Sequence, residues 1–442
     1  MDALFPPGPQ KSLLFGDAPH FKQNPLDFML QSARTYGDLV HFRFGPSHAY
    51  LLTNPRDAHY VLVERHDQFA EQITLGRALN SAMGHDLFAP KEKSKSKALR
   101  RGAFQTRWLN DSLSGIAQST ADALDRWQGG DPLELLETIT GQIVAATLFG
   151  DVHNTDRVIR LRRALAAQRD EADFQSPLTL PNWIPTASNR KRQRASAEVK
   201  CLVEQILHDQ RTMHQPGILN CLLLGDTGET QAVEEVLVLF RAGCDSATQT
   251  VAWAWSLLAT HPDAADSLQA ETGTVLGDRL PTADDLPNLP YCEMILKETM
   301  RLHPPVWLVS RQAKRETRLG DYYVPSGSTI FISPYIVHHS QRYFTSPEHF
   351  LPERFGESFA RRGTNYAYIP FGAGTYAQAA HDYALTIGTL VLALAAQRFQ
   401  LGMVKESQKN LKFAVEPRGL QLQPERFAAV VQATSSINCP QG

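Results

Sequence analysis

The sequence predicts a mostly α-helical protein with a smaller β part and a long central buried helix. Residues 232–260 give the longest helical pattern, and they are apolar on most faces, which is typical of a helix inside the protein. From Leu109 onward, apolar residues recur at three- and four-residue spacing, as expected for helices. Short apolar and aromatic segments near residues 40–53 and 322–332 supply the β part.

The elements follow in order along the chain. Gly45-Pro46 is a turn signal between two short strands, which predicts a hairpin from Leu39–Phe44 and Ala49–Thr53. Prolines at positions 177, 181 and 185 predict a loop between two helices. The remaining predicted elements are helices at Thr138–Phe149, Ala195–Gln210, Ala232–Thr260, Leu289–Leu302 and His381–Ala396, and strands at Tyr322–Val324 and Thr329–Ile332.

Composition excludes several classes of protein. The net charge of -2 gives no reason to expect a nucleic-acid partner. The five cysteines include no Cys-x-x-Cys pair, which argues against a disulfide framework and for a reducing compartment. No stretch approaches the length of an apolar membrane span, and no linker interrupts the chain, so we expect one cytoplasmic domain over residues 1–442.

An ordered set of motifs carries a resemblance to a known family. Glu298-Thr-Met-Arg301 places two charges on one helical face, and His303-Pro304-Pro305 ends that helix. Residues 347–355, Pro-Glu-His-Phe-Leu-Pro-Glu-Arg-Phe, and Phe371-Gly-Ala-Gly374 follow. In this order the motifs resemble the core of the cytochrome P-450 haem-thiolate monooxygenases. The resemblance implies that fold, with Glu298, Arg301 and Arg354 as a structural triad beneath the haem.

The chain departs from the family where haem is held. After Gly374 the family has x-Arg-x-Cys-x-Gly, whereas this chain has Tyr376 at the arginine, Gln378 at the cysteine and Ala380 at the glycine. A carboxamide is a poor iron ligand compared with a thiolate. Of the residues that contact the haem propionates in the family, Arg311 is kept. We therefore expect no haem, with ligation through His381 or Tyr376 as the rival interpretation.

Polar residues interrupt the long apolar helix. A buried arginine at position 241 needs an anionic partner, and Asp245 lies one turn later. A pair within the helix is one interpretation, and a clamp for an anionic ligand such as a diphosphate is the other. Asp245-Ser246 resembles the acid–alcohol pair that relays protons in the family. It is interpreted as a remnant, an Mg²⁺ ligand or a general acid/base.

Two charged segments offer further candidates. Asp170, Glu171 and Asp173 lie within four residues and supply the oxygen ligands that Mg²⁺ prefers, although a solvated acidic turn is the simpler interpretation. The run from Lys91 to Arg101 is either a solvated loop or a lid over phosphate groups.

These observations lead to one preferred hypothesis and two alternatives. The preferred function is a haem-independent, Mg²⁺-dependent terpene cyclase that acts on a prenyl diphosphate, with sesquiterpene-type cyclisation. Asp245 and Ser246 would be catalytic, and Asp245 would also bind metal together with Asp170, Glu171 and Asp173. Arg241, Arg311 and Tyr376 would bind the diphosphate. The alternatives are a non-catalytic partner that activates a glycosyltransferase, and a monooxygenase with unusual haem ligation.

Overall fold

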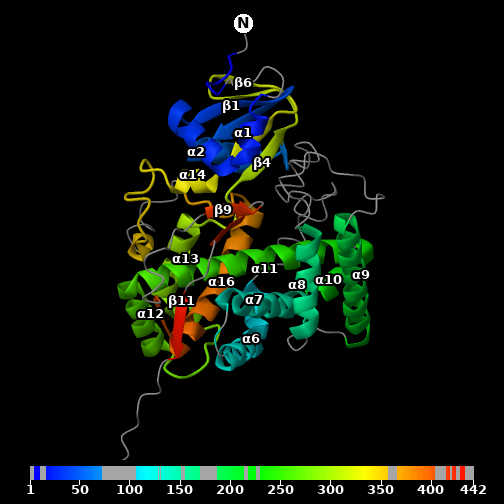
Figure 1. Ribbon diagram of the computed structural model, residues 1–442, viewed down its shortest axis with the longest axis vertical. Coiled ribbons are helices and arrows are strands. Elements are labelled where there is room, and N and C mark those ends of the chain that lie inside the picture. Colours follow the sequence, from blue (N-terminus) through cyan, green and yellow to red (C-terminus); the bar gives the residue numbers. More distant parts are fainter. Residues whose placement is uncertain are drawn as a thin grey trace, which may run out of the picture.

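The computed structural model places a β-rich part beside a larger helical part (Figure 1). It describes residues 4–9, 16–71, 106–127, 129, 131–150, 155–169, 187–213, 218–224, 229–356, 366–403, 415–418, 421–424 and 429–433. The predicted loop of prolines, the acidic residues 170–173 and the basic run at 91–101 lie outside these ranges.

Helices account for most of the described chain. The long ones are α6 (Thr106–Arg126), α7 (Pro132–Phe149), α8 (Thr155–Arg169), α9 (Ala187–Met213), α11 (Glu229–Thr260), α12 (Pro262–Val275), α13 (Pro290–Leu302) and α16 (Thr375–Arg398). The shorter ones are α1 (Ala18–Gln23), α2 (Pro25–Tyr36), α3 (Pro55–His59), α10 (Ile218–Leu224) and α14 (Pro334–His338), with single turns at Tyr60–Glu64, Leu286–Asn288 and Pro352–Phe355.

The main sheet joins strands from distant parts of the sequence. Its five strands run in the order β1 (Leu39–Phe44), β2 (Ser47–Leu52), β7 (Thr329–Ile332), β4 (Val309–Ala313), β3 (Phe69–Glu71). β2 and β7 pair in parallel, whereas the other neighbours are antiparallel. Two-stranded sheets pair β5 (Thr317–Leu319) with β6 (Tyr322–Val324), β8 (Phe399–Met403) with β11 (Ala429–Ala433), and β9 (Val415–Arg418) with β10 (Gln421–Pro424).

The mostly α prediction is confirmed, although several helices begin earlier than predicted, among them α16. The prediction began this helix at residue 381, whereas it begins at Thr375. Gly374 precedes it with a φ of 109°, a backbone conformation that glycine adopts without strain. The N–H of Gln378 then donates to the carbonyl of Gly374 at 3.1 Å, which is the first bond of the helix. The prediction missed this turn because its small residues lack an apolar pattern.

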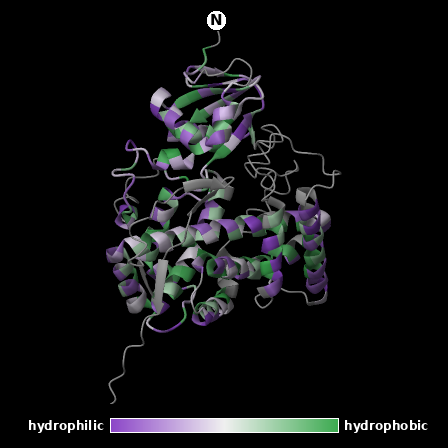
Figure 2. Cartoon of the chain, viewed as in Figure 1, coloured by the Kyte–Doolittle hydropathy of each residue, from purple (hydrophilic) through white to green (hydrophobic). Residues whose placement is uncertain are grey.

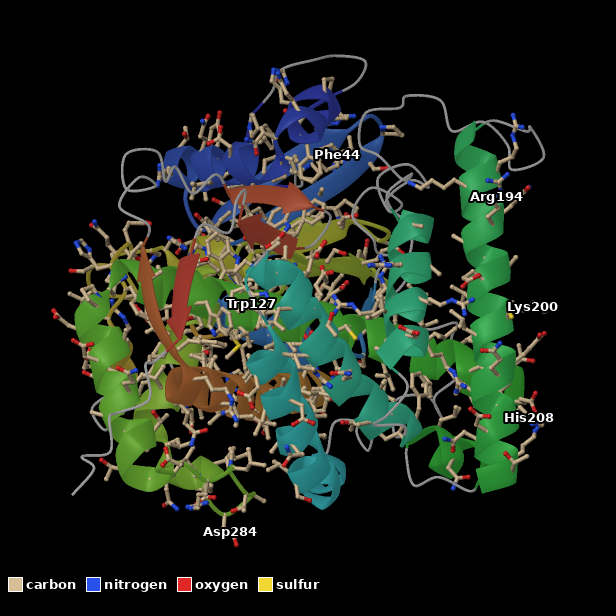
Figure 3. All side chains as sticks on the ribbon, turned by 60° about the horizontal axis from the view of Figure 1, so that its bottom comes forward. Phe44, Trp127, Arg194, Lys200, His208 and Asp284 are labelled. Carbon is tan, nitrogen blue, oxygen red and sulfur yellow. The ribbon has the colours of Figure 1, made fainter. Side chains whose placement is uncertain are left out.

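The largest core cluster surrounds α11. It combines buried residues of α6, α7, α11, α13 and α16, and hydrophobic residues are interspersed with hydrophilic ones along the helices (Figure 2). Gly243 allows a close approach of three helices, because a Cβ there would lie 3.2 Å from Val144 of α7 and 3.6 Å from Tyr383 of α16. On the outside, α9 carries exposed Arg194, Lys200 and His208 (Figure 3).

One helix among the described residues is long and apolar enough to cross a membrane, contrary to the expectation that no stretch approaches this length. It is Ala377–Arg398, with a mean hydropathy of 1.4, and 67% of it is buried inside the protein. Core helices of globular proteins pass the same test. The tertiary contacts of this helix with α11, α12 and α13 are those of a core helix.

Candidate functional site

A buried ion pair stands at the end of α13. Arg301 donates from Nε and Nη2 to the two carboxylate oxygens of Glu298, both at 2.8 Å, and neither side chain has any exposed surface. The spacing of three residues on a helix brings the two groups together. Arg301 also donates to the carbonyls of His338 at 2.9 Å and His349 at 3.2 Å. The pair therefore ties α13 to two later segments.

Arg354 completes the cluster from the single turn at residues 352–355. Its Nε lies 3.3 Å from the Glu298 carboxylate, and its side chain is 11% exposed. It also donates to the carbonyls of Thr345 at 2.6 Å and Ser346 at 3.2 Å. The structure thus brings together the three residues that the sequence motifs grouped as a structural triad.

His338 connects this cluster to the loop that precedes α16. Its Nδ1 donates to the carbonyl of Arg301 at 3.0 Å, and its Nε2 accepts from the N–H of Ile369 at 3.0 Å. These two bonds require the neutral ring, because Nε2 must be unprotonated to accept. Burial lowers the pKa of His338 well below 6.5, and the nearby Arg301 adds to the effect. No sequence motif indicates this contact, because its partners are 31 and 37 residues away.

On α11, Arg241 and Asp245 form the pair that their spacing suggested. Arg241 Nε lies 3.8 Å from the Asp245 carboxylate, and the two side chains are 7% and 23% exposed. Ser246 lies beside them and donates its hydroxyl to the carbonyl of Ala242 at 2.8 Å. The partly exposed positions 242, 245 and 246 share one face of α11, whereas Gly243, Cys244 and Ala247 are buried. This face therefore offers a small polar patch within an otherwise apolar helix.

A polar contact between α7, α8 and α11 was missed by the sequence analysis. The hydroxyls of Thr140 and Thr248 lie 2.6 Å apart, and Arg162 donates to Thr140 at 3.3 Å. Burial raises the pKa of Glu137, opposed by Arg162 and reinforced by Asp245. No motif links these residues, because they lie on three helices and meet only in the folded chain.

The first turns of α16 carry the position of the family's cysteine. Gln378 is exposed, and its Nε2 donates to a carboxylate oxygen of Asp382 at 2.8 Å. Nδ1 of His381 lies 3.3 Å from the same oxygen. Nε2 of His381 is buried and has no hydrogen-bond partner. The rings of Tyr368 and Phe371 meet the His381 ring edge-on.

The remaining candidates do not gather into one site. Arg311 lies on β4 and donates to the carbonyl of Ser310 at 2.8 Å. The side chain of Tyr376 and the acidic residues Asp170, Glu171 and Asp173 lie outside what the structure describes. Within the described ranges, no three His, Cys, Asp or Glu side chains are grouped as a metal site would require, and Asp245 faces Arg241 instead.

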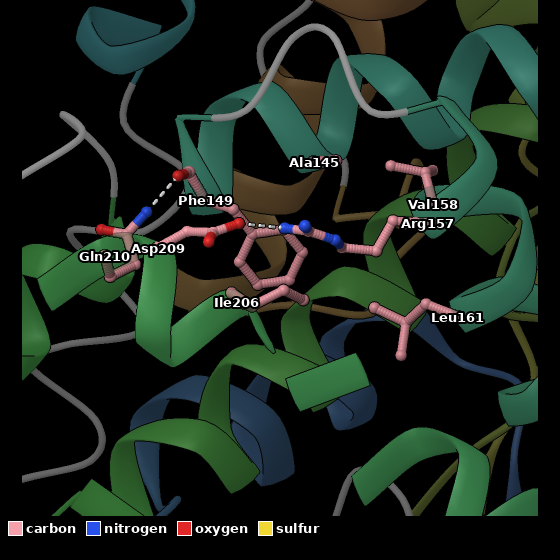
Figure 4. A pocket seen from close by; sticks show the side chains of 8 residues that line it. All are labelled: Ala145, Phe149, Arg157, Val158, Leu161, Ile206, Asp209 and Gln210. Carbon is pink, nitrogen blue, oxygen red and sulfur yellow. Dashed lines mark hydrogen bonds and ion pairs between the residues drawn. The ribbon is translucent and has the colours of Figure 1, made fainter. Parts of the chain in front are cut away.

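A pocket lies between α7, α8 and α9 (Figure 4). Its volume is about 330 Å³, including the part open to solvent. Arg157 and Asp209 form an ion pair of 2.6 Å at its edge, and Gln210 donates to the carbonyl of Phe149. The other lining side chains are apolar: Ala145, Val158, Leu161 and Ile206. None of the lining residues comes from α11 or α16, so this pocket is separate from the predicted site.

Comparisons with known proteins identify the relatives of this chain. The family model described as Cytochrome P450 matches residues 6–429. The cyclooctat-9-en-7-ol 5-monooxygenase of Streptomyces melanosporofaciens is 30% identical, over 88% of this chain and 87% of that protein. Cyclooctatin synthase of the same organism is 28% identical over 88% of both chains. Pentalenene oxygenase of Streptomyces avermitilis is 25% identical over 92% and 94%.

These relatives correct the preferred functional hypothesis. A haem-free, Mg²⁺-dependent terpene cyclase is wrong, because relatives along nearly the whole chain are named as oxygenases and not as lyases. The expectations of magnesium as a cofactor and of no haem are wrong for the same reason, since the family and these relatives indicate haem. The changed loop covers a few residues, whereas the likeness to the family extends over residues 6–429.

The donor set nevertheless does not fit a thiolate-bound haem. A haem-thiolate enzyme holds iron through a deprotonated cysteine, and position 378 offers a carboxamide that donates to Asp382. Cys201 is exposed on α9, whereas Cys244 and Cys292 are buried in α11 and α13. Burial raises the pKa of Cys244 to about 12, which keeps it a thiol.

The fold agrees with the family, whereas the residue at the ligand position does not. Family membership is assigned from the fold and from the match along the chain. The buried triad of Glu298, Arg301 and Arg354 is assembled, and the family match extends far beyond it on both sides. The chain belongs to the cytochrome P450 family.

Proposed function

We propose that this chain is a monooxygenase of the cytochrome P450 family that acts on a cyclic terpenoid. The observation that carries the proposal is its 30% identity, over 88% of the chain, to a protein named for oxygenating cyclooctat-9-en-7-ol. A second relative is named for oxygenating pentalenene. Both names describe ring compounds that are almost entirely hydrocarbon.

The face of α11 supports such a substrate. A terpenoid alcohol needs apolar contacts along most of its surface and one hydrogen-bonding partner for its hydroxyl. Near Asp245 and Ser246 this helix offers both, because the two polar side chains and the small apolar Ala242 are partly exposed on the same face. Arg241 lies beside Asp245 and fixes its orientation by charge.

The substrate test uses the purified full chain, supplied with haem and with a ferredoxin and its reductase. We expect product with one added oxygen atom from cyclooctat-9-en-7-ol or from pentalenene, detected by mass spectrometry under ¹⁸O₂. Unchanged terpenoids, in an assay where the pentalenene oxygenase makes product, would contradict the proposal.

Variants of α11 test the polar patch. Asp245→Asn and Ser246→Ala should each lower turnover about tenfold or more, the effect of losing about 1.4 kcal/mol of transition-state stabilisation. Asp284→Asn is the matched control, because Asp284 is exposed in the turn after α12 and points outward at the edge of the molecule (Figure 3). Equal activity of all three variants would show that Asp245 and Ser246 on α11 are not part of the substrate site.

A further inference from the structure

We infer that a haem bound by this chain has no sulfur ligand at position 378 or from the cysteines whose side chains the structure describes, because Gln378 occupies the family's ligand position at the start of α16. The inference rests on the proposed function, since it concerns the cofactor of the same site. It is tested by spectroscopic signatures of the iron ligand, which do not depend on turnover.

The backbone at position 378 belongs to the helix. Its N–H donates to the carbonyl of Gly374 at 3.1 Å, one turn earlier. The side chain therefore projects from the surface of α16, and it is exposed. From there it reaches the residue one turn later, because residues four apart are neighbours on a helix.

The amide of Gln378 is engaged by Asp382. Nε2 donates to the carboxylate at 2.8 Å, a hydrogen bond strengthened by the charge of its acceptor. The same carboxylate oxygen lies 3.3 Å from Nδ1 of His381. Gln378, Asp382 and His381 thus form one polar set at the start of α16. In this set the amide NH₂ is a donor to a carboxylate, and the neutral amide supplies no thiolate for iron.

The other described cysteines do not replace the missing sulfur. Sγ of Cys292 lies 3.8 Å from the carbonyl of Thr389, between α13 and α16, and burial raises its pKa. Cys244 on α11 is buried in the protein core and is 1% exposed. Cys201 is exposed on α9. None of the three lies on the loop from 366 to 374 or in the first turn of α16.

Among the described side chains at the start of α16, His381 offers an alternative donor to iron. Its Nδ1 faces a carboxylate, and its Nε2 has no hydrogen-bond partner. A histidine that ligates a metal often has a carboxylate on its other ring nitrogen. The test therefore includes this residue. A nitrogen ligand from His381 would be compatible with the absence of sulfur.

The experiment compares ligand signatures in the full chain loaded with haem. Resonance Raman and magnetic circular dichroism should show no iron–sulfur signature in the unchanged chain or in Gln378→Ala. Gln378→Cys should gain that signature and retain haem more tightly on a desalting column. His381→Ala tests whether any nitrogen signature comes from that ring, and its loss in this variant supports the inference.

Three results would overturn the inference. The first is an iron–sulfur signature in the unchanged chain, and the second is a changed ligand signature in Gln378→Ala. The third is a Gln378→Cys protein without the iron–sulfur signature, because position 378 would then not face the iron. If Gln378→Cys gains the signature and still leaves terpenoids unchanged, the proposed substrate class fails while the inference stands.

Discussion

The end of α13 keeps the residue types of the family, whereas the start of α16 does not. At the end of α13, Glu298 and Arg301 have no exposed surface, and both keep the residue types expected of the family. At the start of α16, Gln378 is exposed and differs from the family's cysteine. Removing one partner of a buried ion pair leaves an uncompensated charge, whereas an exposed side chain can be exchanged with little effect on folding. The scaffold can therefore be kept while the ligand position changes.

The largest expected effect comes from breaking the buried pair. Arg301→Ala should destabilise the protein by about 3–5 kcal/mol, because Glu298 would be left buried without its partner. Urea unfolding followed by circular dichroism measures the change. The matched control is Arg342→Ala, whose ion pair with Asp38 is 64% exposed on the arginine side and should contribute little to stability because solvent screens it. Similar losses of unfolding free energy in both variants would contradict the expected difference between the buried and the exposed ion pair.

The second prediction concerns pH. Burial lowers the pKa of His303 and His338 well below their ordinary value of 6.5. Below pH 6.5 the unfolded chain takes up protons on these rings while the folded chain does not. The contribution of these neutral rings to the free energy of unfolding is therefore fully present above about pH 6.5. Below that pH it falls by about 1.4 kcal/mol per pH unit for each ring.

Unfolding free energies measured between pH 7.5 and 5 test this slope. His66→Gln, which changes an exposed histidine, should leave it unaltered. A stability that is flat from pH 6.5 down to 5 would show that neither buried ring is held neutral.

A smaller effect is expected where α12 meets α13. The Glu271 carboxylate accepts from the N–H groups of Tyr291 at 2.7 Å and Cys292 at 2.9 Å, which otherwise have no partner in the first turn of α13. Glu271→Ala should lower the free energy of unfolding by about 1–2 kcal/mol. Asp266→Ala, an exposed change on the same helix, is the comparison, and an equal loss there would refute the capping role.

The smallest effect should follow from changing the ligand position itself. Gln378→Ala removes one exposed hydrogen bond within a helix, which contributes less than about 0.5 kcal/mol. The midpoint of urea unfolding should shift little compared with Arg301→Ala. A loss above about 2 kcal/mol would mean that Gln378 stabilises the fold as much as a buried residue does. A change at this position would then have affected folding.

Most of the secondary structure could be predicted from local patterns. The strands Tyr322–Val324 and Thr329–Ile332 have the predicted bounds, and the long buried helix differs by three residues at its start. The α16 start could not be predicted, because its first turn is set by Gly374 and by hydrogen bonds rather than by an apolar repeat. Among the candidate site residues, the motifs correctly grouped Glu298, Arg301 and Arg354.

The sequence by itself determined the helical and strand segments, the grouping of the triad and the loss of the cysteine, because each depends on local spacing or on the identity of one residue. Only the tertiary structure decided that His338 joins Arg301 to Ile369, and that Thr140 meets Thr248, since these contacts join residues far apart in the chain. It also decided that Gln378 donates to Asp382. A side chain's partner depends on the direction in which the folded backbone points it, and residue type alone does not specify that direction.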